Sequence, residues 1–365
     1  MLKEWQQIYS QLSGYIEEHP EIEISAGVVS IPENVRSEFW HLCDLLRRAY
    51  LEEEFSDLLH EATMLEQHYV KSEQEVTRLL KLKEVSMEAS LGRFLHDPID
   101  QLVRVLSDSL FNLLKAKVDV KGFKEEAIKT VKNSFRRFYS LGYEKWVVLS
   151  LVILCRADEI LRTEHPRSVH AAGLAKLEMF PESENVRIPE KSNSIFFHHS
   201  SFALFTVPDF IIHSATTHKK IAFRSYIVKP LLLAGNASDN REWIPIRPMA
   251  EILSDFVAVY SSTNINDIFI TADAARICRP DLIVEYKTQA NWYEEEMRMV
   301  KLHHEMLKPI LGTFVVSMVD VPEKYSGLQD SGINVLEAGF DQSRLEPIVS
   351  ALMTDVIVAN KQKNP

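Results

Sequence analysis

Residues 279–287 of the chain read Arg279-Pro280-Asp281-Leu282-Ile283-Val284-Glu285-Tyr286-Lys287. The stretch is short and largely apolar after its proline, a pattern that predicts a buried strand. Side chains of a strand alternate between its two faces, so Glu285 and Lys287 share one face. A carboxylate and an ammonium are costly to bury in a core strand. We therefore expect this strand to carry the chemistry of the protein.

The segments that flank this strand predict helices and further strands. Downstream, apolar residues recur at helical spacing over residues 293–307, and an apolar strand is expected at residues 313–319. Upstream, the pattern predicts a helix that begins at Arg247-Pro248 and bears Glu251, a strand over residues 266–271 and a turn over residues 272–276. Strands that alternate with helices imply a sheet that helices cover on at least one face.

The expected turn brings a second carboxylate to the strand. If it joins two antiparallel strands, Asp267 falls opposite Glu285. Directly opposed residues are about 5 Å apart, close enough for two carboxylates to share a divalent cation. Lys287 would then orient or deprotonate a water molecule, or stabilise negative charge that develops on a phosphate. Together these groups are typical of metal-assisted phosphodiester hydrolysis.

The order of these elements resembles the PD-(D/E)XK nuclease superfamily over about residues 248–320. Glu285-Tyr286-Lys287 matches the (D/E)XK element, and Asp267, which no proline precedes, matches the upstream acidic position. The resemblance implies a restriction-endonuclease-like core, Mg²⁺ or Mn²⁺ as cofactor, and Asp267, Glu285 and Lys287 as catalytic residues. It also implies that Asp267 and Glu285 bind the metal, with Glu251 as an additional acidic residue of the metal site.

Two other acidic residues compete with Asp267 for the upstream position. The literal Pro-Asp pairs of this sequence are Pro208-Asp209 and Pro280-Asp281. Asp209 begins an apolar strand but lies so far upstream that the motif would need a large insertion. Asp281 is too close to Glu285 in the chain to occupy an adjacent strand. We therefore rank Asp267 first, Asp209 second and Asp281 third.

Basic and polar residues near the motif are candidates for contacts with nucleic acid. In this superfamily the helix after the motif often lies along the nucleic-acid backbone. The resemblance therefore implies phosphate contacts by Arg276, Arg279, Arg298 and Lys301, with Gln289 touching the substrate or metal-bound water. A solvated basic edge is the alternative interpretation of the four basic residues, and a plain polar loop residue that of Gln289.

The rest of the chain predicts a two-domain α+β protein. Residues 1–165 predict an all-helical domain, in which Asp97 and Pro98 open one helix and residues 124–139 and 143–162 form two more. Prolines and polar residues over 166–193 predict a linker. Residues 194–365 predict an α/β domain with a mixed central sheet. Its first part predicts a small antiparallel group of strands at 194–206, 210–214 and 221–233.

Composition narrows the class of protein. The 365 residues carry a formal net charge of −11, which argues against a general polyanion-binding surface. The three cysteines fit neither a disulfide framework nor a zinc site, and are expected to be reduced and buried. No signal peptide is evident, and the longest apolar run is about half of what a membrane span needs. These features predict a cytoplasmic protein that does not enter a membrane.

Four histidines form a weaker cluster of candidates: His198, His199, His213 and His218. No carboxylate or cysteine stands beside them at the spacing of metal ligands. We interpret them as structural or exposed histidines.

The sequence thus predicts a metal-dependent nuclease, with DNA favoured over RNA as its substrate and a role in restriction or phage defence conceivable by analogy. The helical domain would bind a protein partner or a second copy of the chain. The alternative is a non-catalytic interaction or scaffold protein with a nuclease-like domain. A third hypothesis, a different hydrolase that uses Asp209 and the histidines, has less support.

Overall fold

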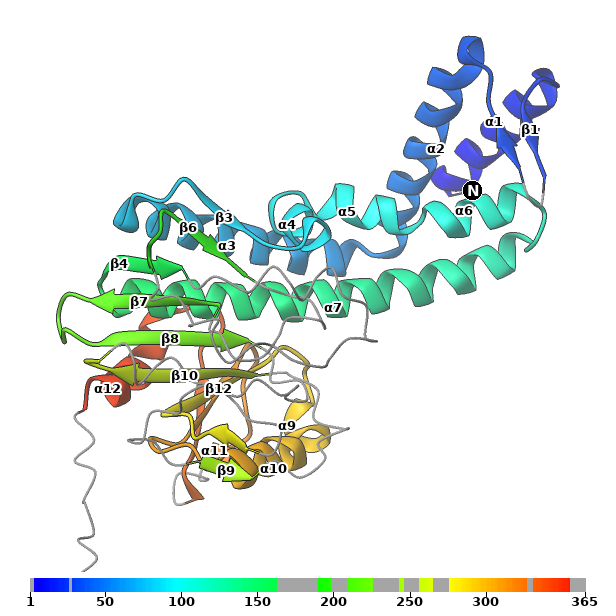
Figure 1. Ribbon diagram of the computed structural model, residues 1–365. Helices are drawn as coiled ribbons and strands as arrows, with labels where there is room; N and C mark the ends of the chain where they lie inside the picture. Colours follow the sequence, from blue (N-terminus) through cyan, green and yellow to red (C-terminus); the bar gives the residue numbers. More distant parts are fainter. Residues whose placement is uncertain are drawn as a thin grey trace, which may run out of the picture. The chain divides into compact units, whose positions relative to one another are not determined.

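The N-terminal part of the chain is helical, as its apolar periodicity predicts. A computed structural model of the protein describes residues 3–25, 28–162, 190–197, 209–225, 243–245, 256–264, 276–326 and 331–354. The helices of this part are α1 (Glu4–Glu18), α2 (Glu33–Glu54), α3 (Ser56–Leu80), α4 (Ala89–His96), α5 (Pro98–Val105), α6 (Ser107–Leu114) and α7 (Val120–Leu154). A short hairpin of β1 (Glu23–Ile24) and β2 (Val29–Ser30) follows α1 (Figure 1). None of the described helices is both long and apolar enough to span a membrane.

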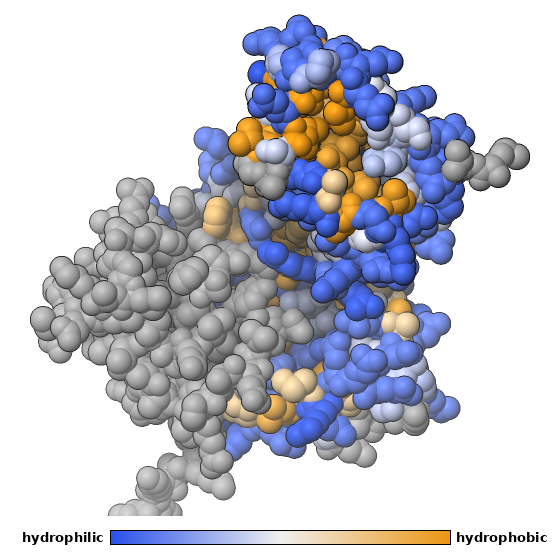
Figure 2. All heavy atoms as spheres, turned by 90° about the vertical axis from the view of Figure 1, so that its right-hand side faces the viewer, coloured by the Kyte–Doolittle hydropathy of each residue, from blue (hydrophilic) through white to orange (hydrophobic). Residues whose placement is uncertain are grey.

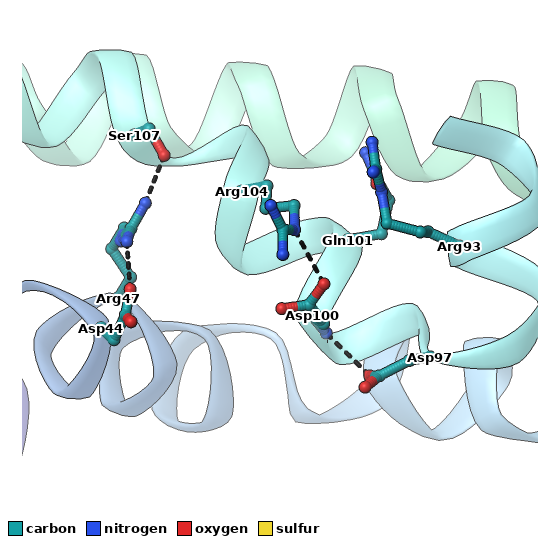
Figure 3. A network of polar contacts seen from close by, with 8 residues as sticks. All are labelled: Asp44, Arg47, Arg93, Asp97, Asp100, Gln101, Arg104 and Ser107. Atoms are coloured by element: carbon teal, nitrogen blue, oxygen red, sulfur yellow. Dashed lines mark hydrogen bonds and ion pairs between the residues drawn. The ribbon is translucent and has the colours of Figure 1, made fainter. Parts of the chain in front are cut away.

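Polar contacts cap α5 and join α2 to α6 (Figure 3). Asp97 caps α5 as its sequence predicts, because its side chain accepts a 2.9 Å hydrogen bond from the backbone N–H of Asp100. Asp100 also pairs with Arg104 one turn later at 2.8 Å. The buried guanidinium of Arg47 on α2 donates to the hydroxyl of Ser107 on α6.

The chain divides into two compact units. A helical unit contains Met1–Val70 and Ala89–Tyr143, and a sheet unit contains Lys71–Glu88 and Glu144–Pro365. The division therefore falls within α3 and α7, and not at the linker that composition suggested. Most of that linker, residues 166–189, lies outside the described residues.

An eight-stranded mixed sheet forms the centre of the sheet unit, in the order β14-β13-β12-β10-β8-β7-β4-β5. Its strands are β4 (Ala157–Arg162), β5 (Glu190–Lys191), β7 (Phe210–Ser214), β8 (Lys220–Ser225), β10 (Phe256–Ser262), β12 (Leu282–Lys287), β13 (Thr313–Ser317) and β14 (Ile333–Glu337). Neighbours from β5 to β12 are antiparallel, whereas β12, β13 and β14 run parallel. A helical segment followed by a mixed sheet confirms the predicted α+β class.

Short elements complete the sheet unit. They are β3 (Glu84–Ser86), which pairs with β6 (Ser194–Phe196), β9 (Trp243–Pro245), which pairs with β11 (Arg276–Cys278), the helices α9 (Trp292–Glu295), α10 (Met297–Leu307), α11 (Glu323–Ser326) and α12 (Glu346–Met353), and a 3₁₀ turn η4 (Gln342–Leu345). Helices α9 and α10 form the crossover between β12 and β13. A crossover of this kind is what two parallel neighbours require.

Helices cover both faces of the large sheet. Apolar side chains of α9 and α10, Trp292, Met297 and Val300, pack in one core with Val315 and Ile333 of the sheet. The other face is covered by the C-terminal part of α7, whose Glu144 accepts a 3.0 Å hydrogen bond from Ser225 of β8. The central strands are therefore buried on both sides, which explains their continuous apolar runs.

A single helix, α7, replaces two helices that the sequence predicts in the first half of the chain. Helix α7 continues through Gly142 to Leu154, and residues 157–162 form strand β4, so the prediction of separate helices at 124–139 and 143–162 is wrong. Gly142 is present for close packing, because a Cβ there would lie 2.7 Å from Leu95 and 2.8 Å from Leu65. A glycine that permits close contact is easily mistaken for a helix break.

Three further predictions for the sheet unit need correction. The helix predicted from Arg247-Pro248 would carry Phe256 and Tyr260 on its apolar face, but residues 256–262 form strand β10, which pairs with β8 and β12. Strands β7 and β8 belong to the large sheet and not to a separate small one. The strand predicted at residues 279–287 begins only at Leu282, and residues 276–278 before it form β11 of a different sheet.

The cysteines behave as expected where they are described. Cys43 and Cys155 are buried free thiols, and burial raises the pKa of each to about 12. Thiols of such high pKa are unreactive at neutral pH. The side chain of Cys278 lies outside the described residues.

The helical unit exposes apolar side chains. Figure 2 shows them gathered over the N-terminal helices at the top of the view, with hydrophilic side chains around them. Exposed apolar residues of this unit include Trp40, Leu45 and Ile128. Surfaces of this kind are typical of protein interfaces. The predicted partner of the helical unit, a protein or a second copy, stays a prediction.

Candidate functional site

The C-terminal half of β12 presents Glu285 and Lys287 on one face, as the sequence predicts. Glu285 pairs with Phe256 of β10 and with Val315 of β13, so the strand has a neighbour on each side. The side chains of Glu285 and Lys287 are only 0% and 3% exposed. Two opposite charges are therefore held inside the core, where each needs a partner.

Lys287 lies between two glutamates. Its Nζ is 3.1 Å from Oε2 of Glu285 and donates a 2.7 Å hydrogen bond to Oε2 of Glu296, the residue that separates α9 from α10. The contact with Glu285 is an ion pair without hydrogen-bond geometry, since Oε2 of Glu285 accepts no hydrogen bond among the described residues. The crossover thus supplies the second negative charge that holds the ammonium.

A buried histidine holds the other oxygen of Glu285. Nδ1 of His303 on α10 lies 3.0 Å from Oε1 of Glu285, and the imidazole ring lies 5.0 Å from the ring of Phe256. Nε2 of His303 is buried and has no hydrogen bond within the part of the chain that the structure describes. An orphaned buried polar atom costs about 1–3 kcal/mol, so this one calls for an explanation.

Sequence reasoning missed His303. The helical spacing over residues 293–307 predicts a stripe of Tyr293, Met297, Val300, His304 and Leu307. The buried positions of α10 are instead Met297, Val300, His303 and Leu307. His304 instead hydrogen-bonds Thr313 at 3.0 Å, and partial burial lowers the pKa of its imidazole. The usable signal was a histidine at an i+3 position of the stripe, on the helix that follows the motif strand.

The predicted acidic partner is not opposite Glu285. Strands β10 and β13 occupy both sides of β12, and the residue paired with Glu285 across β10 is Phe256. The prediction of Asp267 at that position is therefore wrong. Asp267 and Glu251 themselves lie outside the described residues, as does Asp255, the residue before Phe256 in the chain.

Asp281 has a structural role at the other end of β12. Its side chain accepts a hydrogen bond from the backbone N–H of Ser261, and its own N–H donates to the carbonyl of Val259 at 3.0 Å. Four residues of strand separate Asp281 from Glu285, about 13 Å at the rise of a strand. Asp281 therefore closes the β10–β12 ladder and cannot share an ion with Glu285.

Asp209 belongs to a second buried polar cluster, on the face that α7 covers. Its Oδ2 accepts a 3.1 Å hydrogen bond from the N–H of Ser225, and Ser225 connects it to Glu144, the ion-pair partner of Lys145. Burial raises the pKa of Asp209 to about 7, with Glu144 adding to the rise and Lys145 and Ser225 opposing it. Three strand spacings separate β7 from β12, about 14 Å, so this cluster is separate from Glu285.

The described histidines of the weaker cluster are paired locally. Nδ1 of His213 lies 2.7 Å from Oδ1 of Asp158 on β4, a carboxylate that only the tertiary fold brings near. The rings of His213 and His218 lie 6.1 Å apart. His198 and His199 lie outside the described residues. Among the residues that the structure describes, no three or more His, Cys, Asp or Glu are grouped to hold a metal ion.

The residues predicted to contact nucleic acid differ in their exposure. Gln289, Arg298 and Lys301 are exposed, and the last two lie on the outer side of α10. The guanidinium of Arg279 donates to the carbonyl of Lys308 at the end of α10. The side chain of Arg276 lies outside the described residues.

The described residues supply part of a divalent metal site. Mg²⁺ prefers carboxylate and water oxygens in an octahedron. Oε2 of Glu285 is a buried carboxylate oxygen without a hydrogen bond among the described residues, which suits it as a ligand. A second carboxylate would have to come from the residues outside the described ranges, or from Glu296 if it released Lys287.

Comparisons with protein-family models, with characterised proteins and with solved structures found no match to this chain. The resemblance to the nuclease superfamily therefore stays a prediction that rests on the motif and on the order of the elements.

We expect Lys287→Met to destabilise the sheet unit by about 3–5 kcal/mol at pH 8, because it leaves the buried carboxylate of Glu285 beside Glu296 without a cation. Urea unfolding at pH 8 measures this loss. The matched control is Lys121→Met, whose exposed ion pair with Glu125 spans 3.9 Å and should contribute less than about 1 kcal/mol. Equal stability of Lys287→Met and the wild type would contradict the buried network.

We expect Asp209→Asn to remove a pH dependence of stability. With a folded pKa of about 7, the carboxyl binds more protons in the folded than in the unfolded state between about pH 4 and 7. Wild-type stability relative to Asp209→Asn should therefore fall by up to about 4 kcal/mol as pH rises through this window. Urea unfolding at pH 4.5, 6 and 7.5 tests it, with the exposed Asp320→Asn as control. A difference that is constant with pH would refute the raised pKa.

Proposed function

We propose that the sheet unit hydrolyses phosphodiester bonds of nucleic acid with a divalent metal ion, and that DNA is the preferred substrate. The observation that carries the proposal is the buried pair of Glu285 and Lys287, two residues apart on one face of β12. The neighbours of β12 support it: an antiparallel strand before it, and a parallel strand reached through a helical crossover after it. This is the order that the resemblance to PD-(D/E)XK nucleases implies.

Each member of the pair has a role in this chemistry. Oε2 of Glu285 would bind Mg²⁺ or Mn²⁺, because Oε1 is already occupied by His303. The metal, when bound, would lower the pKa of a water molecule and neutralise charge on the phosphate. The ammonium of Lys287 would stabilise the negative charge that develops on the phosphate oxygens, a task for which a fixed, buried cation is suited.

The proposed chemistry needs a second carboxylate as a metal ligand. Among the described residues, Glu296 would serve if it released Lys287, which it contacts at 2.7 Å. Asp267 and Glu251, the residues that the resemblance implies, lie outside the described residues.

The outer side of α10 is a plausible track for the phosphate backbone. Arg298, Lys301 and Lys308 are exposed along it and just beyond its end. Lysine and arginine contacts to phosphate supply most sequence-independent affinity for nucleic acid. A local basic stripe is compatible with the net charge of −11, which concerns the whole chain. A role of the protein in restriction or phage defence stays a prediction.

The second candidate function is a non-catalytic interaction protein. The observation that favours it is the pairing of Lys287, whose ammonium is buried and already engaged by two carboxylates. In this alternative the ion network only stabilises a nuclease-like scaffold, and the exposed apolar side chains of the helical unit bind the partner.

Cleavage assays separate the two candidates. We expect the purified full chain with Mg²⁺ or Mn²⁺ to cut plasmid or single-stranded DNA faster than RNA, and Glu285→Gln to lower the rate by at least about 100-fold, because the neutral amide is a poor metal ligand. Glutamine keeps the shape of the side chain, so the fold should survive, which circular dichroism checks. Glu294→Gln, an exposed neutral substitution on the same crossover, should leave the rate unchanged.

Two results of this assay would argue against the proposal. Cleavage by Glu285→Gln at the wild-type rate would place the activity elsewhere or in a contaminant. No cleavage of any nucleic acid by the wild type with either metal would favour the interaction protein.

A further inference from the structure

The imidazole of His303 is fixed by two elements of the fold. Helix α10 buries His303 in line with Val300 and Leu307, which pack into the core. Strand β10 places the ring of Phe256 5.0 Å from the imidazole ring. A ring held from two sides has little rotational freedom. The position of Nδ1 is therefore set by the fold and not by a flexible surface contact.

His303 and Lys287 contact different carboxylate oxygens of Glu285. Nδ1 of His303 lies 3.0 Å from Oε1, whereas Nζ of Lys287 lies 3.1 Å from Oε2. An ionised carboxylate only accepts hydrogen bonds, so Nδ1 carries the proton that it donates to Oε1. Oε2 is left with an ion pair and no hydrogen bond among the described residues. The carboxylate is thus asymmetric: His303 hydrogen-bonds Oε1, whereas Oε2 has only the ion pair with Lys287.

We propose that His303 is the positioning residue of the candidate metal ligand Glu285: its Nδ1–H fastens Oε1 and so directs Oε2 towards the cation. The inference rests on the proposed function, since it assigns His303 a task within that same site. Hydrogen bonds to a ligating carboxylate fix its orientation, and loss of such a partner typically weakens metal affinity 10–100-fold.

The orphaned Nε2 distinguishes this role from mere packing. An apolar residue in the same place would fill the core without leaving a buried nitrogen unsatisfied. The rival role, His303 as a direct ligand through Nε2, predicts a preference for transition metals, because imidazole is a poor ligand for Mg²⁺. The two roles use different nitrogens of one ring, and substitutions can tell them apart.

The test compares three substitutions of His303 in the full chain. The amide nitrogen of Asn stands near the position of Nδ1, that of Gln near the position of Nε2, and Leu fills the space without a donor. We expect His303→Asn to bind Mn²⁺ within about 3-fold of the wild type, and His303→Gln and His303→Leu to bind it about 10–100-fold more weakly. Calorimetry without nucleic acid measures the affinity, and thermal unfolding confirms that each variant is folded.

Each outcome bears on one of the two proposals. Normal Mn²⁺ affinity in His303→Leu, with loss of binding in Glu285→Gln, would overturn the positioning role and leave the nuclease proposal intact. Equal weakening of His303→Asn and His303→Leu, or stronger retention in His303→Gln, would overturn it in favour of ligation or packing. No Mn²⁺ or Mg²⁺ binding by the wild type would overturn the proposed function itself.

A second measurement needs no metal. In ¹⁵N-labelled protein, the ring resonances of His303, identified by their absence in His303→Asn, should show a proton on Nδ1 that Glu285→Leu removes or exposes to rapid exchange. A ring protonated on Nε2 alone would refute the hydrogen bond on which the proposal depends.

Discussion

The burial of Glu285 and Lys287 on one face of β12 is the constraint around which the sheet unit is arranged. Removing two charges from water costs several kcal/mol per ion, and their attraction offsets this only when the geometry is good and the remaining polar atoms are bonded. The crossover meets this need from both of its helical segments: Glu296 at their junction binds the ammonium, and His303 on α10 binds the carboxylate. The parallel pairing of β12 and β13 thus brings in the helix that completes the network.

The same end of the sheet carries a second set of buried charges on its opposite face. Ser225, which links Asp209 to Glu144, pairs with Val257, the neighbour of the residue opposite Glu285. The sheet itself separates the two sets, because adjacent residues of a strand point to opposite faces. The two sets of charges offset the free-energy cost of burial in different ways. The pair at Glu285 has counter-charges in contact, whereas Asp209 approaches neutrality through a raised pKa.

Sequence patterns predicted the elements that depend on a few neighbouring residues. They failed where contacts between residues far apart in the chain determine the structure. The apolar run of β12, the strand at 210–214 and the cap formed by Asp97 were predictable, because strand burial and helix capping depend on neighbours in the chain. Strand β10 was not, since Phe256 and Tyr260 fit helical and strand spacing equally well and only pairing with β8 and β12 selects the strand. For the site, Glu285 and Lys287 were visible as a pair. His303 was not predictable as a site residue, because its role depends on a contact with Glu285 that joins a helix to a strand 18 residues away in the chain.

The enzyme and scaffold hypotheses make different demands on the net charge of the site. Two carboxylates and one ammonium leave the network at Lys287 with a net charge of one negative unit. A phosphodiester carries the same charge, so the network alone repels it, and more strongly in the core than in water. A divalent cation at Oε2 reverses the sign and makes the site attract phosphate. The nuclease proposal therefore requires the cation both to bind substrate and to react with it. The scaffold alternative requires no cation, because the ammonium of Lys287 already lies 3.1 Å from Oε2 of Glu285. The atom that a purely structural network leaves unexplained is Nε2 of His303, which is buried and has no hydrogen bond among the described residues.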